Sequence, residues 1–206
     1  MNQKVDFAHV AEPLVIVISG PSGVGKDSVV EAMKSRGKPF HFVVTATTRA
    51  ARPEEVHGED YFFISSEEFA QMIDEGELLE YAIVYNDYKG IPKQQVRQAL
   101  ASGKDVVMRV DVQGAATVRK ISPEAVLIFL TTEDEAELVK RLNARETETT
   151  EDLALRIATA RQELKRIHEF DYVVVNHENE LEATVDTVLS IITAEHHRTQ
   201  PRKVIM

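Results

Sequence analysis

The sequence contains no cysteine among its 206 residues, and this absence excludes a disulfide framework, a thiolate nucleophile and a thiolate metal site. No apolar run approaches the ~20 residues that a membrane-spanning helix requires. Residues 1–12 lack the apolar core of a signal peptide, and their two acidic residues are atypical of a transit peptide. We therefore expect a cytoplasmic protein that has no membrane partner.

Basic residues are also few, because 24 Lys and Arg face 34 Asp and Glu, which gives a formal net charge of −10. An acidic chain repels a phosphate backbone, so we expect no nucleic acid partner. With 43% hydrophobic residues, a chain of this length can bury one substantial core. We expect a single domain over residues 1–206, as a monomer or a homodimer.

The most informative segment is rich in glycine and lies between an apolar strand candidate, residues 14–18, and a helical pattern from residue 26. Two glycines five positions apart, followed by lysine, allow backbone N–H groups to surround a polyphosphate. An ordinary strand-to-helix turn is the alternative, but strand, glycine-rich motif and helix in this order favour nucleotide binding. The predicted nucleotide-binding residues are Gly20, Pro21, Ser22, Gly23, Val24, Gly25, Lys26, Asp27 and Ser28.

Asp27 departs from the usual form of this motif, in which Ser or Thr follows the lysine and its hydroxyl binds Mg²⁺. A carboxylate is a hard oxygen ligand that can hold magnesium directly or through water. The alternative is that Asp27 only complements the positive end of the helix. The sequence leaves both interpretations open.

Four short apolar runs have the length and the β-branched content of buried parallel strands. Helical patterns separate them, at residues 26–36, 92–102, 133–144, 151–169 and 181–195. This alternation predicts an α/β fold with a doubly wound parallel sheet, whose ligands bind at the carboxyl ends of the strands. The predicted strands are residues 14–18, 106–110, 126–130 and 172–175.

Two segments interrupt the alternation. Residues 42–90 contain short strand and turn patterns and predict a small mixed subdomain. Residues 141–163 contain four arginines in an otherwise acidic chain. The remaining residues, 1–41, 91–140 and 164–206, form the predicted core.

Arg49 and Arg52 lie three residues apart in the first of these segments and could grip one phosphate with their planar donor groups. Tyr61 could add a hydroxyl to the same anion. A solvated loop with incidental ion pairs is the alternative when the segment is considered alone. Beside a phosphate-binding loop, a second anion site becomes the better interpretation.

Six segments together resemble the guanylate kinase family: GPSGVGKD, TTRAARPEEVHGEDYFF, LLEYAIVYNDYKGIP, DVQGAATV, RLNARETET and FDYVVVN. The resemblance covers roughly residues 14–195, and the GKD and YKGIP variants look closest to the plant-organelle branch and its bacterial relatives. It implies a P-loop nucleoside monophosphate kinase in which residues 42–90 bind GMP and residues 141–163 form a lid. It also implies transfer of the γ-phosphoryl group of ATP to GMP or dGMP, with Mg²⁺ as cofactor, in purine nucleotide metabolism.

The resemblance implies roles for the residues at matching positions on the acceptor side. Arg49, Arg52 and Tyr61 would hold the phosphate of GMP, and Glu80 would accept hydrogen bonds from N1–H and the exocyclic amine of guanine. Adenine offers no such pair of donors, so one carboxylate can discriminate the bases. The implied GMP-binding residues are Thr45, Arg49, Arg52, Glu55, Tyr61, Glu80 and Asp111.

On the donor side, the resemblance implies that Arg145 and Arg156 close over the transferring phosphoryl group. Arg141 and Asn176 would lie nearer the adenine of ATP. The implied catalytic residues are Lys26, Arg49, Arg145 and Arg156.

Asp111 resembles the acidic group that orients the magnesium and phosphate region, so Asp27 and Asp111 are the implied magnesium ligands. Arg109 stands where the family usually has Asp or Glu, and it could form an ion pair with Asp111 or with Asp27. If Arg109 approaches Asp27, we hypothesise that the two departures from the family pattern compensate. Residues 89–91 read Lys-Gly-Ile where the family often has Tyr-Gly-Ser or Tyr-Gly-Thr. Ile91 cannot supply the hydroxyl that helps to recognise GMP. Either another group replaces it, with Lys89 as the candidate, or the affinity for GMP is lower.

Other functions are compatible with parts of this pattern. A P-loop kinase for another nucleoside monophosphate or for a sugar phosphate is the nearest alternative, and Glu80 with the two arginines favours GMP over these. A non-catalytic guanylate-kinase-like scaffold typically lacks the phosphate loop, which is intact here. A regulatory GTP switch needs an NKxD-type signature, and the sequence has none.

Overall fold

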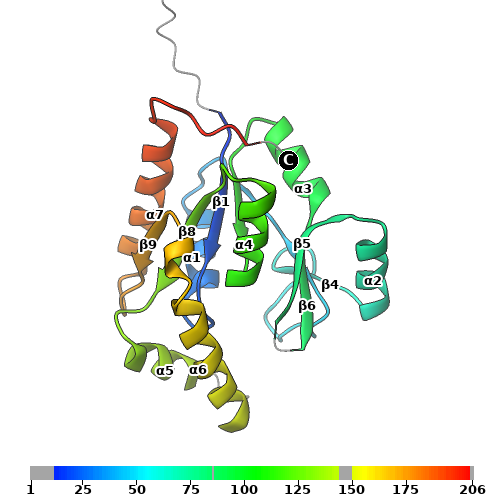
Figure 1. Ribbon diagram of the computed structural model, residues 1–206, viewed down its shortest axis with the longest axis vertical. Helices are drawn as coiled ribbons and strands as arrows, with labels where there is room; N and C mark the ends of the chain where they lie inside the picture. The colour runs from blue at the N-terminus through cyan, green and yellow to red at the C-terminus, as the bar shows by residue number, and fades with distance from the viewer. Residues whose placement is uncertain (1–11, 85, 144–149, 205–206) are drawn as a thin grey trace, which may run out of the picture.

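The computed structural model describes residues 12–84, 86–143 and 150–204, which form two sheets and their helices (Figure 1). The larger sheet has the strand order β2-β7-β1-β8-β9, and all of its pairings are parallel. This arrangement confirms the predicted α/β fold. Its strands are β1 (Val15–Ser19), β2 (His41–Phe42), β7 (Val106–Arg109), β8 (Val126–Thr131) and β9 (Tyr172–Val175).

Alternate residues of β1 enter two separate hydrophobic cores, because successive side chains of a strand point to opposite faces. Ile16 and Ile18 pack in a core with side chains of α1 (Lys26–Ser35) and α7 (Leu181–His196). Val15 and Val17 pack on the other face with α3 (Lys93–Ala101) and α4 (Val112–Ile121). All five residues of β1 are buried, which explains the continuous apolar run in the sequence.

The five predicted helices are present, with ends shifted by up to a few residues. The helix expected at 133–144 is α5 (Glu135–Asn143), and the one expected at 151–169 is α6 (Thr150–Leu164), followed by a 3₁₀ turn at Ile167–Glu169. The sequence interpretation missed α4, because its ten residues include a glycine and several β-branched residues, which weaken the helical pattern. Among the described residues, no helix has both the length and the apolar character needed to cross a bilayer.

The second sheet is mixed and has the order β4-β3-β6-β5. Its own core contains Ala46, Phe69 and Leu78. The strands are β3 (Thr45–Thr47), β4 (Tyr61–Phe63), β5 (Leu78–Val84) and β6 (Asp87–Pro92).

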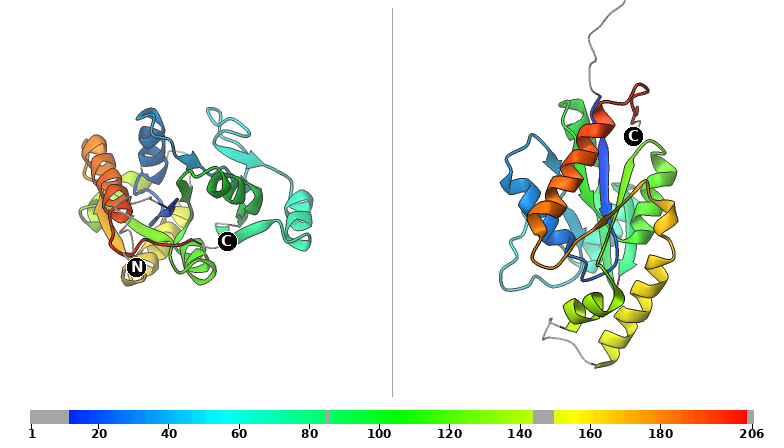
Figure 2. Two further views of the ribbon diagram at one scale, coloured as in Figure 1. Left: turned by 90° about the horizontal axis from the view of Figure 1, so that it is seen from above. Right: turned by 90° about the vertical axis from the view of Figure 1, so that its left-hand side faces the viewer.

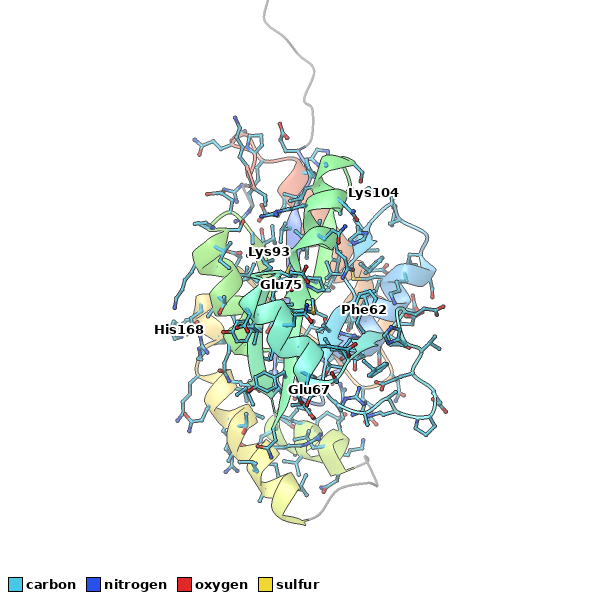
Figure 3. The ribbon with its side chains drawn as sticks, turned by 90° about the vertical axis from the view of Figure 1, so that its right-hand side faces the viewer. Phe62, Glu67, Glu75, Lys93, Lys104 and His168 are labelled. Carbon is cyan, nitrogen blue, oxygen red and sulfur yellow. The ribbon has the colours of Figure 1, made fainter. Side chains whose placement is uncertain are left out.

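Helix α2 (Ser66–Asp74) packs on the second sheet, in a segment where we expected only short strands and turns. Its start has a capping box, since the Ser65 hydroxyl accepts from the Glu68 backbone N–H while the Glu68 carboxylate accepts from the Ser65 backbone N–H. Figure 3 shows Glu67 and Glu75 on its outer side, where both are exposed. This serine-to-glutamate spacing was the sequence signal for the missed helix.

The two sheets and the α5–α6 pair meet near the carboxyl ends of the parallel strands. In Figure 1 the second sheet lies beside the larger one, while α5 and α6 lie beyond the carboxyl ends of the parallel strands. The two views of Figure 2 agree with this placement. Ligand sites of parallel sheets lie outside these carboxyl ends, so the fold places the candidate site between the three parts.

Candidate active site

A cavity of about 590 Å³ lies between the glycine-rich segment, the second sheet and α5. This volume is in the range of small-molecule sites. Pro21, Val24, Glu55 and Arg156 are not in its lining, and Arg145 lies outside the described residues. The predicted site residues that line the cavity are Gly20, Ser22, Gly23, Gly25, Lys26, Asp27, Ser28, Thr45, Arg49, Arg52, Tyr61, Glu80, Asp111, Arg141 and Asn176.

The phosphate loop joins β1 to α1 and has backbone angles that favour glycine. Gly25 has φ 90° at the N-cap of α1, and a Cβ there would lie 2.5 Å from Nδ2 of Asn176. The Asn176 side chain donates from Nδ2 to the carbonyl of Val24 at 2.9 Å and accepts from the Thr184 hydroxyl at 3.0 Å. Asn176 therefore holds the loop in shape from β9, in addition to lining the cavity.

Lys26 begins α1 and folds back over the loop. Its Nζ donates to the carbonyl of Pro21 at 2.7 Å and to that of Gly20. Burial lowers the pKa of Lys26, and this shift is opposed first by Glu163 and then by Asp27. The ammonium group is thus held at the loop, bonded to carbonyl oxygens that a phosphate oxygen can replace as acceptors.

Asp27 and Arg109 form an ion pair, with 2.6 Å between Oδ1 and Nη1. This contact confirms that the two residues pair, and the functional compensation of the two departures from the family pattern stays a prediction. Arg109 also donates from Nη2 to the carbonyl of Asp60 at 3.2 Å, and its guanidinium carbon lies 4.7 Å from the ring centroid of Tyr61. One side chain at the end of β7 thereby connects α1 with the second sheet.

Glu55 holds the two arginines of the second sheet. Its two carboxylate oxygens each lie 2.8 Å from Nη2 of Arg49, and one of them accepts from the backbone N–H of Arg52. Burial opposes ionisation, but the Arg52 N–H and the Arg49 guanidinium together hold the pKa of Glu55 below its usual range. Both arginines line the cavity, while Glu55 supports them from outside its lining.

Glu80 lies on β5 and is 4% exposed, and its Oε2 has no hydrogen-bond partner among the described residues. Burial first, and the nearby Asp111 second, raise the pKa of Glu80 to about 8. The buried hydroxyl of Thr45 also has no partner in the described part of the chain. A buried polar group without a partner is costly, so these two groups indicate a polar ligand at this end of the cavity.

Asp111 is the N-cap of α4, where its Oδ1 accepts from the Gly114 backbone N–H at 2.8 Å. Both Asp111 and Asp27 line the cavity with hard oxygen atoms. No group of three or more candidate ligands that could hold a metal ion occurs within residues 12–84, 86–143 and 150–204. Mg²⁺ commonly needs only one or two carboxylates besides substrate phosphates, so this donor set fits magnesium.

Glu163 is a cavity-lining residue that the sequence interpretation missed. It lies near the end of α6, and its Oε2 is buried without a hydrogen-bond partner among the described residues. Burial raises the pKa of Glu163 to about 7, opposed by the charge of Lys26. In the sequence, Glu163 occurs in a helical pattern typical of a solvent-exposed face, and nothing there indicates that it lines a cavity.

The arginines near the α5–α6 pair differ in their placement. Arg141 lines the cavity, where it donates to Glu137 at 2.6 Å and to the Asn176 carbonyl at 3.0 Å. Arg156 is half-buried on α6, away from the cavity lining. The conformation described here therefore brings Arg141, but not Arg156, to the cavity.

Comparisons with known proteins agree with this arrangement. The family model described as Guanylate kinase matches residues 12–195. A chloroplastic/mitochondrial guanylate kinase 2 from Oryza sativa subsp. japonica is 57% identical over 199 residues, which cover 96% of this chain and 70% of that one. A guanylate kinase from Halalkalibacterium halodurans is 45% identical over 183 residues, 89% of each chain.

A solved structure, the crystal structure of a guanylate kinase from Anaplasma phagocytophilum, has a TM-score of 0.76 at 29% sequence identity. The match covers 92% of this chain and 89% of that one. These findings confirm the resemblance that the six motif segments suggested. The chain belongs to the guanylate kinase family.

Proposed function

We propose that this protein transfers the γ-phosphoryl group of ATP to GMP, and to dGMP, giving ADP and GDP or dGDP. The observation that carries the proposal is one cavity that contains both a phosphate loop and the buried carboxyl group of Glu80, whose Oε2 has no hydrogen-bond partner within the described part of the chain. The phosphate loop suits a polyphosphate, and the carboxyl group suits a base with two adjacent donors. Arg49 and Arg52 line the same cavity and suit the acceptor phosphate.

The donor half of the site consists of the loop from Gly20 to Ser28. Its backbone N–H groups and the N-terminus of α1 would bind the β- and γ-phosphates of ATP, as the left-handed angle at Gly25 allows. Lys26 would exchange its loop carbonyl partners for phosphate oxygens. Arg141 and Asn176, which line the cavity beside the loop, would lie toward the adenine.

The acceptor half lies on the second sheet. Arg49 and Arg52 would bind the phosphate of GMP, with Tyr61 beside them and Glu55 holding both arginines in position. Glu80 would lose its proton and accept from the two guanine donors, with the Thr45 hydroxyl nearby. AMP lacks that donor pair, so the buried carboxylate would stay without partners in an AMP complex.

Magnesium would be held by Asp111, Asp27 and the substrate phosphates, which are hard oxygen ligands. When bound, it supplies positive charge that offsets the developing charge of the transferring group. Asp27 is already paired with Arg109 at 2.6 Å, so a role through water fits its geometry better than direct ligation. This chain's own residues would then place the two phosphates in line.

The reaction needs positioning rather than a general base, since the attacking oxygen of GMP is already ionised. Lys26 would neutralise the donor and Arg49 would orient the acceptor. Closure of residues 141–163 would bring Arg145 and Arg156 over the transferring group and exclude water, which otherwise hydrolyses ATP. An acidic chain thus concentrates its cations where the substrates carry charge.

An assay of ADP release with ATP and each of GMP, dGMP, AMP and dTMP tests the proposal. We expect turnover with GMP and dGMP and at least ~100-fold lower kcat/KM with the other two, the range reached when a base-reading group is left unpaired. Preference for AMP or dTMP would instead indicate another nucleoside monophosphate kinase. Absence of turnover with GMP binding retained would indicate a scaffold.

The proposed location is the cytoplasm, with an organelle as the alternative. Relatives that match this chain include bacterial guanylate kinases and one named as chloroplastic/mitochondrial. Fractionation of the source cells with an antibody against the chain distinguishes the two locations.

A further inference from the structure

Lys89 lies in the cavity because of the alternation of side chains along β6. Lys89 and Ile91 share one face of the strand, and Gly90 lies on the other, where Phe69 and Leu78 approach it. Ile91 is fully buried in the core beneath α3 and α4. Two residues earlier on the same face, the side chain of Lys89 extends beyond that core and lines the cavity.

The surroundings of Lys89 are unusually positive. Apart from a contact with the Tyr61 ring, its Nζ has no hydrogen-bond or ion-pair partner in the described part of the chain. Burial first, and then the charges of Lys26, Arg49 and Arg109, lower the pKa of Lys89 to about 8. The charge of Asp27 opposes this shift, and Asp27 is already paired with Arg109.

Three cations surround the ring of Tyr61. The ring centroid lies 5.7 Å from Nζ of Lys89, 5.5 Å from the guanidinium carbon of Arg49 and 4.7 Å from that of Arg109. Arg49 is neutralised by Glu55 and Arg109 by Asp27, but Lys89 has no such partner among the described residues. An anion that reaches Arg49 beside Tyr61 therefore also meets an uncompensated ammonium group.

We propose that Lys89 binds the phosphate of the acceptor nucleotide together with Arg49, and so makes this site selective for a nucleoside 5′-monophosphate over a nucleoside. The inference rests on the proposed function, which supplies the acceptor. A lysine ammonium acts as a compact charge with three donors and tolerates several phosphate orientations. Lys26 lines the same cavity and its charge acts on Lys89, so the two ammonium groups would face the substrate phosphates together.

A purely structural role for the Lys89 side chain is the competing explanation. The backbone of residue 89 pairs with Thr47 and with Ala82, and these pairings do not depend on the side chain. Removal of the charge by Lys89→Met preserves the length of the side chain and should leave the sheet intact. Lys89→Arg preserves the charge and serves as the rescue variant.

Calorimetric titration of GMP and of guanosine into the wild-type protein, Lys89→Met and Lys89→Arg at pH 7 tests the inference. We expect Lys89→Met to weaken GMP binding at least tenfold and to leave guanosine binding unchanged, whereas Lys89→Arg stays within about threefold of wild type; one charge-assisted contact has this order of effect. Lys104→Met, which removes an exposed lysine far from the cavity, is the matched control (Figure 3).

Two results would overturn the inference: unchanged GMP affinity in Lys89→Met, or an equal loss of guanosine affinity, which would indicate a structural role. If guanosine binds too weakly to titrate, the comparison of Lys89→Arg with Lys89→Met decides between phosphate binding and a structural role. A structural role of the long side chain would be preserved equally by methionine, whereas phosphate binding is restored only by arginine. Turnover of GMP by the wild-type protein is measured in parallel. Its absence would count against the proposed function, while normal turnover with an unaffected Lys89→Met variant would count against this inference alone.

Discussion

Two regions of the molecule bury charged groups in opposite ways. In the cavity, Glu80 and Glu163 each have a buried carboxylate oxygen without a hydrogen-bond partner among the described residues. At the far end of the fold, Glu195 is 2% exposed and accepts from Arg202 at 2.7 and 2.9 Å and from the Tyr172 hydroxyl at 2.6 Å. Burial alone therefore does not separate the two regions.

The difference lies in the partners. Burial opposes ionisation of Glu195, but the Arg202 and Tyr172 hydrogen bonds hold the pKa of Glu195 below its usual range, whereas burial raises the pKa of Glu80 to about 8. A paired buried charge fixes the position of the C-terminal segment against α7 and β9. A buried carboxyl group without a hydrogen-bond partner destabilises the protein, and a ligand that donates to it removes this penalty. Glu80 and Glu163 thus leave acceptor oxygens for a ligand, whereas the hydrogen bonds of Glu195 serve the framework.

Removing the cation of the phosphate loop is the strongest way to test the cavity side of this contrast. Lys26→Ala should lower kcat at least ~100-fold, because a cation of this role stabilises charge in the transition state. Steady-state ADP release checks the value. Lys34→Ala, on the same helix and paired with Glu31, is the control. Near-normal turnover in Lys26→Ala would contradict the assigned role.

Removing the charge of Glu195 tests the framework side. Glu195→Gln should lower the free energy of unfolding by about 2 kcal/mol, since Arg202 keeps a buried charge without its partner. Urea unfolding measures the loss, and kcat should stay unchanged. Glu182→Gln, which breaks an exposed pair with Arg36, should cost below about 0.5 kcal/mol. Equal effects of the two variants would remove the distinction between buried and exposed pairs.

The ion pair between Asp27 and Arg109 joins the two halves of the site, and a double-mutant cycle measures its coupling. Arg109→Asp alone places a second carboxylate beside Asp27 and should lower kcat/KM for ATP about tenfold by repelling the phosphates. The double variant with Asp27→Ser should recover most of this loss, because it restores the family's usual residue types. Strict additivity of the two effects would show that the pair carries no coupling.

Proton exchange on GMP binding is the smallest and most specific signal. With the pKa of Glu80 about 8, this carboxyl is protonated at pH 7, and ionisation on binding guanine should release somewhat less than one proton. With the pKa of Lys89 also about 8, the amine is neutral at pH 9 and should take up a proton from solvent on binding phosphate. Calorimetry in buffers of different ionisation enthalpy should therefore show release at pH 7 and uptake at pH 9.

Two variants assign these protons. Glu80→Gln should abolish the release at pH 7, and Lys89→Met should abolish the uptake at pH 9. If the wild-type protein releases protons at both pH values, or takes them up at both, the raised pKa of Glu80 and the lowered pKa of Lys89 do not coexist in the cavity.

The parts of the site that are local in sequence were predictable. The strand, phosphate loop and helix lie within about twenty residues, and glycine spacing reports the backbone angles directly. The contact of Asp27 with Arg109 was predicted only as a hypothesis, because it joins residues 82 positions apart. Its basis was a pair of chemically complementary departures from one family pattern.

Other features depend on tertiary structure that no short motif encodes. Glu163 resembles a solvated residue in sequence, and only the packing of α6 over the loop buries it. Helix α2 had a capping signal at Ser65, but the strand-like aromatic residues around it dominated the interpretation. The support of the loop by Asn176 likewise requires β9 to lie beside it in space.

Helix α4 comes so near to β5 that a Cβ on Gly114 would lie 2.8 Å from Oε2 of Glu80 and 3.0 Å from Cβ of Val110. The N–H of the same glycine is bound by Asp111 at 2.8 Å. The wall behind the Glu80 carboxyl group is thus main chain, fixed where the helix starts. Any side chain at that point would meet Oε2 of Glu80 and displace the carboxyl group, so the position of this proposed guanine ligand depends on how closely α4 approaches it.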